Sequence, residues 1–277
     1  MDLEDSFILN LTAAEVEWIL NEIQAPSMRL YPSPFINKPA EKMRKTLDNA
    51  GRSLLKRGWI ENQPDDNVVI DITVAAMVGA LGFAKTALFV EIFQEHTFSP
   101  QVTRYFSAEG LLIEQSASDD GEIILTALRN VQILHKQLQE HLDLKGEGVS
   151  GRGTFKCGAA LFADVPFTLA GDGESAAIAQ LIELGADARF AADLISAMNV
   201  PIQQSTLELI ALDAQQPDGV RLAGRLNLIE GVYGLWVLRS YLEGETPFLE
   251  ITPAAAAEAK GFVGELLNAF LAHDAGT

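Results

Sequence analysis

Residues 86–92 read TALFVEI, and residues 206–212 read TLELIAL. Both segments are rich in apolar and β-branched residues, which favour strands. Two more pairs of segments match in the same order: GLLIEQS at 110–116 with GLWVLRS at 234–240, and DDGEIILTAL at 119–128 with EGETPFLEIT at 243–252. The members of each pair lie roughly 120 to 125 positions apart. The pattern therefore predicts a duplicated antiparallel meander.

Helical patterns precede the first meander. Thr12 and Glu15 fit a capping box, in which each side chain satisfies a free backbone amide at the start of a helix. A second helix is expected over residues 39–57, because its apolar positions recur with helical spacing and Gly58 is a typical C-terminal stop. A third helix is expected over residues 73–81. The N-terminal half thus begins with helices and continues with strands.

Each meander closes with a long amphipathic helix. The first is expected over residues 131–142, and the last over residues 253–271 with Pro253 in its first turn. Between the two meanders the sequence predicts one strand and two helices, at residues 154–163, 174–184 and 188–198.

This order of elements predicts an α+β fold of two related helix–meander–helix halves. We expect residues 1–277 to form a single pseudo-symmetric domain. Its N-terminal half is residues 1–145, its C-terminal half is residues 154–277, and a glycine-rich linker at 146–153 joins them. Because free sheet edges are a liability, the halves are expected to form a central antiparallel sheet with pseudo-twofold symmetry, flanked by helices. A remaining free edge would favour a homodimer.

Composition limits the classes of function. The 277 residues include 20 Lys or Arg and 38 Asp or Glu, so the net charge is −18, which disfavours nucleic acid and anionic lipid as partners. The N-terminus lacks a signal-peptide pattern, and glycines and Lys85 interrupt the most apolar run, residues 72–90. The single cysteine, Cys157, excludes an internal disulfide and fits a reducing compartment. We therefore expect a cytoplasmic protein that does not enter the membrane.

The chemical motifs are weak. Residues 146–151 spell GxGxxG, but this segment follows a helix rather than a strand, so the linker interpretation is favoured over a nucleotide site. The two acidic pairs, Asp65–Asp66 and Asp119–Asp120, fit turns rather than a catalytic cleft. His135 and His141 stand six residues apart, which does not suit metal ligands on one helix face; the other histidines are His96 and His273. We therefore expect no catalytic residue, no cofactor and no bound metal.

Several motifs carry a family resemblance. LTAAE at residues 11–15 opens the first helix, LKRGWI at 55–60 closes the second, and PFLEITPA at 247–254 follows the late segment 231–239. In this order they resemble the EspG family of type VII secretion chaperones, although Trp59, Ile60 and Phe248 depart from the family's pattern. The resemblance implies a quasi-twofold central sheet flanked by helices. It also implies a non-catalytic role: holding the helical tip of an aggregation-prone secretion substrate. No binding residues can be carried over, because the family has no tight binding motif.

One basic segment keeps a second hypothesis open. Lys38 and the helix after it concentrate positive charge, followed by Gly58 and a possible short hairpin. A basic helix before a hairpin is typical of a winged-helix domain, so the alternative is a nucleic-acid-binding regulator that uses residues 38–57. Its candidate contacts are Lys42, Arg44, Lys45, Arg52, Lys56 and Arg57.

Overall fold

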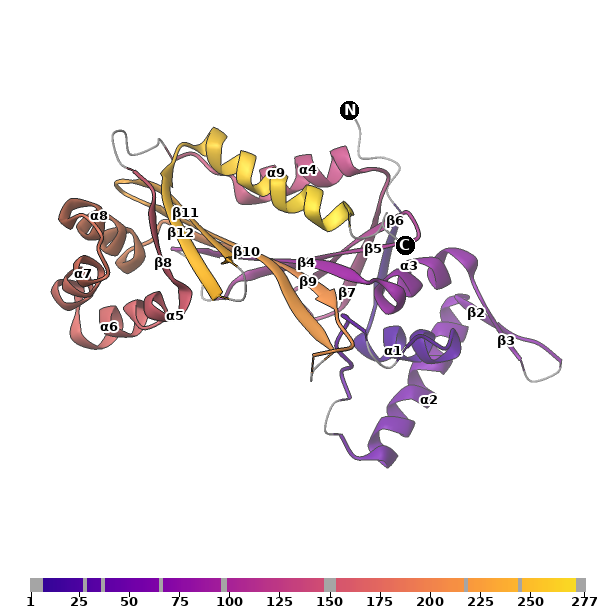
Figure 1. Cartoon of the computed structure of the whole chain (residues 1–277). Helices are drawn as coiled ribbons and strands as arrows, with labels where there is room; N and C mark the ends of the chain where they lie inside the picture. Colours follow the sequence, from indigo (N-terminus) through magenta and orange to yellow (C-terminus); the bar gives the residue numbers. More distant parts are fainter. Residues whose placement is uncertain are drawn as a thin grey trace.

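The computed structural model describes residues 7–26, 29–35, 38–64, 67–95, 99–146, 153–216, 219–243 and 246–272 (Figure 1). The helices are α1 (Ala13–Glu22), α2 (Ala40–Arg57), α3 (Ile72–Phe83), α4 (Val131–Leu142), α5 (Ala159–Phe162), α6 (Val165–Asp172), α7 (Glu174–Glu183), α8 (Ala188–Asn199) and α9 (Ala256–Ala272). The strands are β1 (Ile8–Leu11), β2 (Ile60–Asn62), β3 (Val68–Ile70), β4 (Thr86–Gln94), β5 (Gln101–Ala108), β6 (Leu111–Ala117), β7 (Ile123–Leu128), β8 (Phe155–Gly158), β9 (Gln203–Leu212), β10 (Val220–Gly231), β11 (Gly234–Glu243) and β12 (Thr246–Ala254).

One large antiparallel sheet organises the described chain. Its ten strands run in the order β1-β7-β6-β5-β4-β9-β10-β11-β12-β8. β4 and β9 pair at the centre, and outward from them β5 corresponds to β10, β6 to β11, β7 to β12 and β1 to β8. The predicted α+β fold, with two pseudo-twofold-related halves and a central antiparallel sheet, is therefore confirmed. The two edges of this sheet are β1 and β8, and the homodimer stays a prediction.

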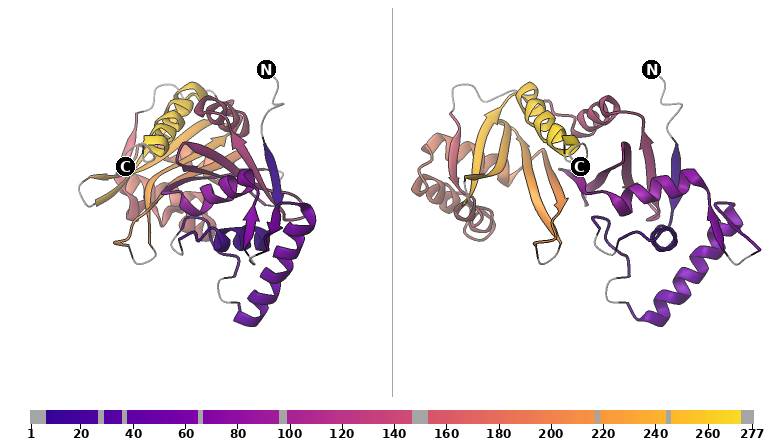
Figure 2. Two further views of the ribbon diagram at one scale, coloured as in Figure 1. Left: turned by 90° about the vertical axis from the view of Figure 1, so that its right-hand side faces the viewer. Right: turned by 45° about the vertical axis from the view of Figure 1, so that its right-hand side comes forward.

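Helices cover the two faces of the sheet differently (Figures 1 and 2). On one face lie α4 and α9, which contact each other, and Leu134, Leu138, Val263 and Leu267 from them share a core with strands of both halves. On the opposite face α1 and α3 pack on the N-terminal half, whereas the layer from α5 to α8 packs on the C-terminal half. One continuous sheet thus carries one helical layer on one face and two on the opposite face.

Local sequence signals set the ends of the first two helices. Thr12 Oγ1 accepts from Glu15 N at 3.2 Å and Glu15 Oε2 accepts from Thr12 N at 2.8 Å, so the predicted capping box is present. Gly58 ends α2 with φ of +74°, a left-handed conformation that glycine adopts at low cost. The hairpin predicted after α2 is also present, as the separate two-stranded sheet of β2 and β3.

Several predicted boundaries are wrong. The strand expected over residues 154–163 ends at Gly158, and α5 follows it directly. Pro253 belongs to β12, and the last helix begins at Ala256. The sequence also gave no prediction of β1 or of α6. β1 has only four residues and pairs with β7, more than 100 positions away, so no local pattern announces it.

The linker is only partly described. Residues 147–152, with most of the GxGxxG motif, lie outside the described residues, as do His96, His273 and the Asp65–Asp66 pair. Gly146 O accepts from Ala256 N at 3.0 Å, and a Cβ at Gly146 would lie 2.8 Å from that of Leu235. This first glycine of the predicted linker is therefore packed against β11 and the start of α9.

Candidate protein-binding surfaces

An uncovered part of the sheet lies at its pseudo-symmetry centre, on the face opposite α4 and α9. Directly paired residues of an antiparallel sheet share a face, so three rows can be followed across β4, β9 and β10. They join Phe93 to Gln204, Glu91 to Thr206 and Asn227, and Phe89 to Glu208 and Arg225. We call these eight residues the central strip. The helical layers α1–α3 and α5–α8 flank it on either side (Figure 1).

The central strip mixes exposed aromatic and charged side chains. Phe93 is 41% exposed, and Glu91, Gln204 and Arg225 are also exposed. Large exposed aromatic and arginine side chains are enriched in protein interfaces. The strip therefore has the composition of a surface that binds another protein.

Polar pairs across the strands hold the strip in place. Arg225 Nε lies 3.3 Å from Glu208 Oε1, and Thr206 Oγ1 donates to Asn227 Oδ1 at 2.9 Å. Farther along the row, the Arg104 guanidinium lies 5.2 Å from the Phe89 ring centre, and Arg104 Nη1 donates to Gln115 Oε1 at 3.2 Å. These contacts restrain five side chains of the strip, which lowers the entropy that binding them would cost. The five are Phe89, Thr206, Glu208, Arg225 and Asn227.

A buried ion pair supports the α1 side of the strip. Arg29 Nη2 lies 2.6 Å from Glu17 Oε2, and both side chains are less than 10% exposed. Tyr31 is buried nearby, and its pKa is raised to about 12 by burial and by the charge of Glu17. Breaking such a pair from one side would leave an uncompensated buried charge.

The six basic residues proposed for nucleic acid all lie on α2. Arg57 is engaged: its Nη1 lies 3.2 Å from Glu15 Oε2, and its Nη2 donates to the backbone oxygen of Asn10 at 2.5 Å. It therefore joins the end of α2 to the α1 cap and the β1 edge, and a phosphate would have to displace those contacts. The other five are exposed on the same helix: Lys42, Arg44, Lys45, Arg52 and Lys56.

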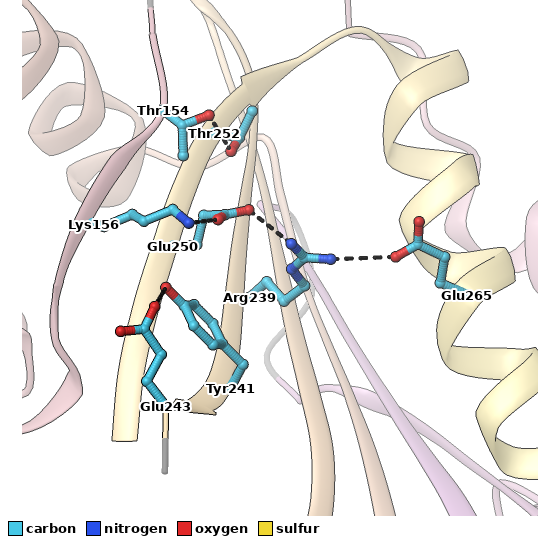
Figure 3. Close-up of polar contacts among 8 residues, drawn as sticks. All are labelled: Thr154, Lys156, Arg239, Tyr241, Glu243, Glu250, Thr252 and Glu265. Carbon is cyan, nitrogen blue, oxygen red and sulfur yellow. Dashed lines mark hydrogen bonds and ion pairs between the residues drawn. The ribbon is translucent and has the colours of Figure 1, made fainter. Parts of the chain in front are cut away.

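A polar cluster occupies the other sheet face, between α9 and the β8 edge (Figure 3). Glu250 on β12 lies 2.9 Å from Lys156 on β8 and 2.9 Å from Arg239 on β11. Arg239 also reaches Glu265 of α9 at 3.2 Å. The hydrogen bond from Lys156, together with the charge of Arg239, holds the pKa of Glu250 below its usual value. The cluster joins four elements, so we assign it a structural role.

The structure also bears on metal ligands, the single cysteine and membrane-spanning helices. Among the described residues, no group of three or more His, Cys, Asp or Glu side chains is placed to hold a metal ion. His135 contacts Gln139 at 3.2 Å on α4, and Cys157 is buried on β8, where burial raises the pKa of its thiol. Within the described part of the chain, each helix is too short or too polar to span a membrane.

The central strip was not predicted from the sequence. The one feature of the sequence that indicates it is an alternation in β9, where Gln204, Thr206 and Glu208 alternate with residues that are buried in the structure. That alternation predicts a strand with one face left uncovered, but it does not say which other strands share that face.

Comparison with solved structures gives a strong match to a chaperone. The chain superposes on the Mycobacterium tuberculosis type VII secretion system chaperone EspG5, solved in complex with a PE25–PPE41 dimer, with a TM-score of 0.65. The match covers 96% of each chain at 12% sequence identity. A second match, to a putative adenylate cyclase from Bacillus halodurans, covers 68% of this chain and 75% of the cyclase chain at 14% identity. Its TM-score of 0.15 is too low to indicate a shared fold.

No family model and no curated protein matches this chain in sequence. At 12% identity the structural match shows a shared fold but does not show that individual residues have the same roles. On that basis, the resemblance predicted from the start of the first helix, the end of the second and the late motif is confirmed as a shared fold: this chain has the fold of the type VII secretion chaperone EspG5.

Proposed function

We propose that this protein is a non-catalytic, cytoplasmic chaperone of the EspG kind, which binds a helical type VII secretion substrate. The observation that carries this proposal is the match over 96% of both chains to a chaperone captured with its protein partner. The overall negative charge of −18 fits a protein that remains dissolved while it holds an aggregation-prone client.

We further propose that the client binds at the central strip. Three features support this location: it is the uncovered middle of the sheet, it exposes Phe93 between charged residues, and helical layers flank it on both sides. The end of a helical client would contact the sheet there and could bury Phe93, whereas the paired charges would form a polar rim.

The test is co-expression with a helical secretion protein, or heterodimer, encoded beside this gene. We expect a complex that survives size-exclusion chromatography. The double substitution Phe93→Asp with Arg225→Glu should abolish co-elution, because it adds charge at the proposed anchor and reverses charge at the rim.

Val232→Asp with Leu242→Asp is the matched control, because Val232 and Leu242 are 75% and 67% exposed and lie outside the strip. This variant should retain the complex. Loss in both variants, or in neither, would place the binding surface elsewhere. Failure to form any complex with the neighbouring helical proteins would overturn the chaperone proposal itself.

A further inference from the structure

The basic residues of α2 form one exposed line. Lys42, Lys45, Arg52 and Lys56 follow each other at spacings of three, seven and four residues, which places them on one side of a helix. Fourteen residues of helix rise about 21 Å, so the line is about 21 Å long. All four side chains are exposed, whereas Ala50 and Leu54 on another side of α2 are buried. We call these four residues the α2 basic stripe.

The stripe has no acidic partner within the described residues. No ion pair joins any of its four side chains to a described residue, in contrast to Arg57. Glu41 and Asp48 precede Lys45 and Arg52 by four residues, a spacing that allows pairing on a helix, yet neither pair closes to ion-pair distance. The cations of the stripe are therefore not paired with the acidic residues of their own helix.

The N-terminal cations of α2 are also placed unfavourably for the helix itself. The positive end of the helix dipole lies at the N-terminus, where Lys42 stands in the first turn and Arg44 and Lys45 in the second. Cations at that end lower the stability of a helix and do not complement it. Lys56 and Arg57 in the last turn complement the dipole, so helix stability leaves only the basic residues of the first two turns unexplained.

The stripe contrasts with the rest of the molecule. α2 has six Lys or Arg against two Asp or Glu, a charge of +4, so the remainder of the chain carries −22. A long polyanion such as duplex DNA would be repelled by that remainder wherever it extended past α2. A short acidic protein segment could contact α2 alone. α2 also projects from the body of the molecule, where such a segment could reach it (Figures 1 and 2).

From this charge complementarity we propose that the α2 basic stripe docks an acidic helical segment of the protein partner. The matching segment has Glu or Asp side chains along one helix face over about 21 Å. This assigns a chemistry to one part of the client, and so it rests on the proposed function. Each exposed ion pair adds only modest affinity and also speeds association, so binding depends on the four cations acting together.

The test measures binding of the full chain to a labelled 20-residue helical peptide with Glu residues along one face, by fluorescence anisotropy at low salt. A peptide with Gln in place of Glu, and a duplex DNA of similar length, are the comparison probes. Lys45→Glu with Arg52→Glu should weaken binding of the Glu peptide about tenfold or more, and rising salt should weaken it in the native chain. The milder Lys42→Gln with Lys56→Gln should give a smaller loss without charge reversal.

The matched control is Lys85→Glu with Lys136→Glu, which changes the net charge equally at exposed lysines outside α2. It should leave binding of the Glu peptide close to that of the native chain. Equal weakening by the control, equal binding of the Gln peptide, or no binding at all would overturn the proposal. Tighter binding of DNA that depends on the stripe would also overturn it and favour the nucleic-acid alternative. Capture of the client at the central strip is a separate measurement, so either proposal can fail alone.

Discussion

Glu114 lies on β6 directly across from Tyr105 of β5, on the sheet face that α4 and α9 cover. Tyr105 is fully buried, and its hydroxyl interacts with the Glu114 carboxyl. Burial raises the pKa of the Glu114 carboxyl, and the charge of His141 offsets part of that effect. The fold therefore favours the protonated form of Glu114.

Replacing this carboxyl should change the dependence of stability on pH. Because the pKa of Glu114 is raised in the fold, its protonated form adds stability at acidic pH, and that stability is lost as pH rises through the folded pKa. Glu114→Gln should therefore be more stable than the native chain by about 1 kcal/mol near pH 8, with the difference vanishing near pH 4. Urea unfolding at both pH values measures it. The exposed Glu109→Gln is the control, and an equal gain there would contradict the assignment.

Residue types alone identified the basic stripe but not the central strip. The stripe lies within one helix, so its cations stand close in the sequence and their excess over Glu41 and Asp48 can be counted directly. The strip joins Phe89 to Glu208 and Arg225, residues more than 100 positions apart. Neither Phe89 nor Arg225 is unusual for its own strand, so only their pairing reveals the site.

At the scale of elements, strand pairing overrode the local signal of Pro253. Pro253 is a common residue at a helix start, but here it pairs with Trp236 as β12 continues along β11. On its other side β12 pairs with β8 only as far as Ile251, so no strand lies beside Pro253 on that side. A proline is tolerated at such an edge, because its missing N–H breaks no ladder hydrogen bond. The helix instead begins where Ala255 N donates to Glu258 Oε2 at 2.9 Å.

One of the matched pairs of strands does not agree in register with the proposed duplication. The alignment of residues 110–116 with 234–240 equates Leu112 with Trp236, but Leu112 packs under α4 and α9 whereas Trp236 packs against the α5–α8 layer on the opposite face. A shift of one residue reverses the face of every side chain in a strand. The match of 110–116 with 234–240 is therefore out of register in that strand, and the sequence repeat stays a prediction although the order of strands is symmetric.

Two glycines on helices should respond oppositely to alanine. Gly58→Ala places a side chain at φ of +74°, so we expect a loss of about 1 kcal/mol in the free energy of unfolding. Gly261→Ala lies inside α9 with no atom within 4 Å of the new Cβ, so we expect a gain of about 0.5–1 kcal/mol from helix propensity. Urea unfolding of both variants measures the pair. The same sign in both would contradict the assigned conformations.

At the scale of the whole molecule, the two halves share their core. Leu88 of β4 and Leu209 of β9 face each other at the centre of the sheet, and both are almost fully buried. Both belong to the cluster that α4 and α9 cover together, one helix from each half. A boundary between independent domains would have to divide that cluster, so the single pseudo-symmetric domain remains our prediction.

That arrangement predicts cooperative unfolding. Leu209→Ala should cost about 2–5 kcal/mol and lower amide protection in the strands of both halves by a similar amount. Hydrogen exchange with mass spectrometry measures each half separately. Leu242→Ala, at a side chain 67% exposed, should change neither half. Protection lost only in the C-terminal half would show that the halves are independent units instead.

The sequence by itself determined most element types: the capped first helix, the basic second helix, the six strand segments that match between the meanders, and both closing helices. These depend on periodicity and end signals within a few residues, which is information that a short segment contains. Only the tertiary structure decided which strands pair, which face each side chain takes, and where the sheet is left uncovered. Those features depend on contacts such as Phe89 with Glu208, whose energy exists only after distant segments have come together. The protein-binding surface proposed here therefore follows from the sheet order, whereas the acidic partner proposed for α2 follows from charges that the sequence already displays.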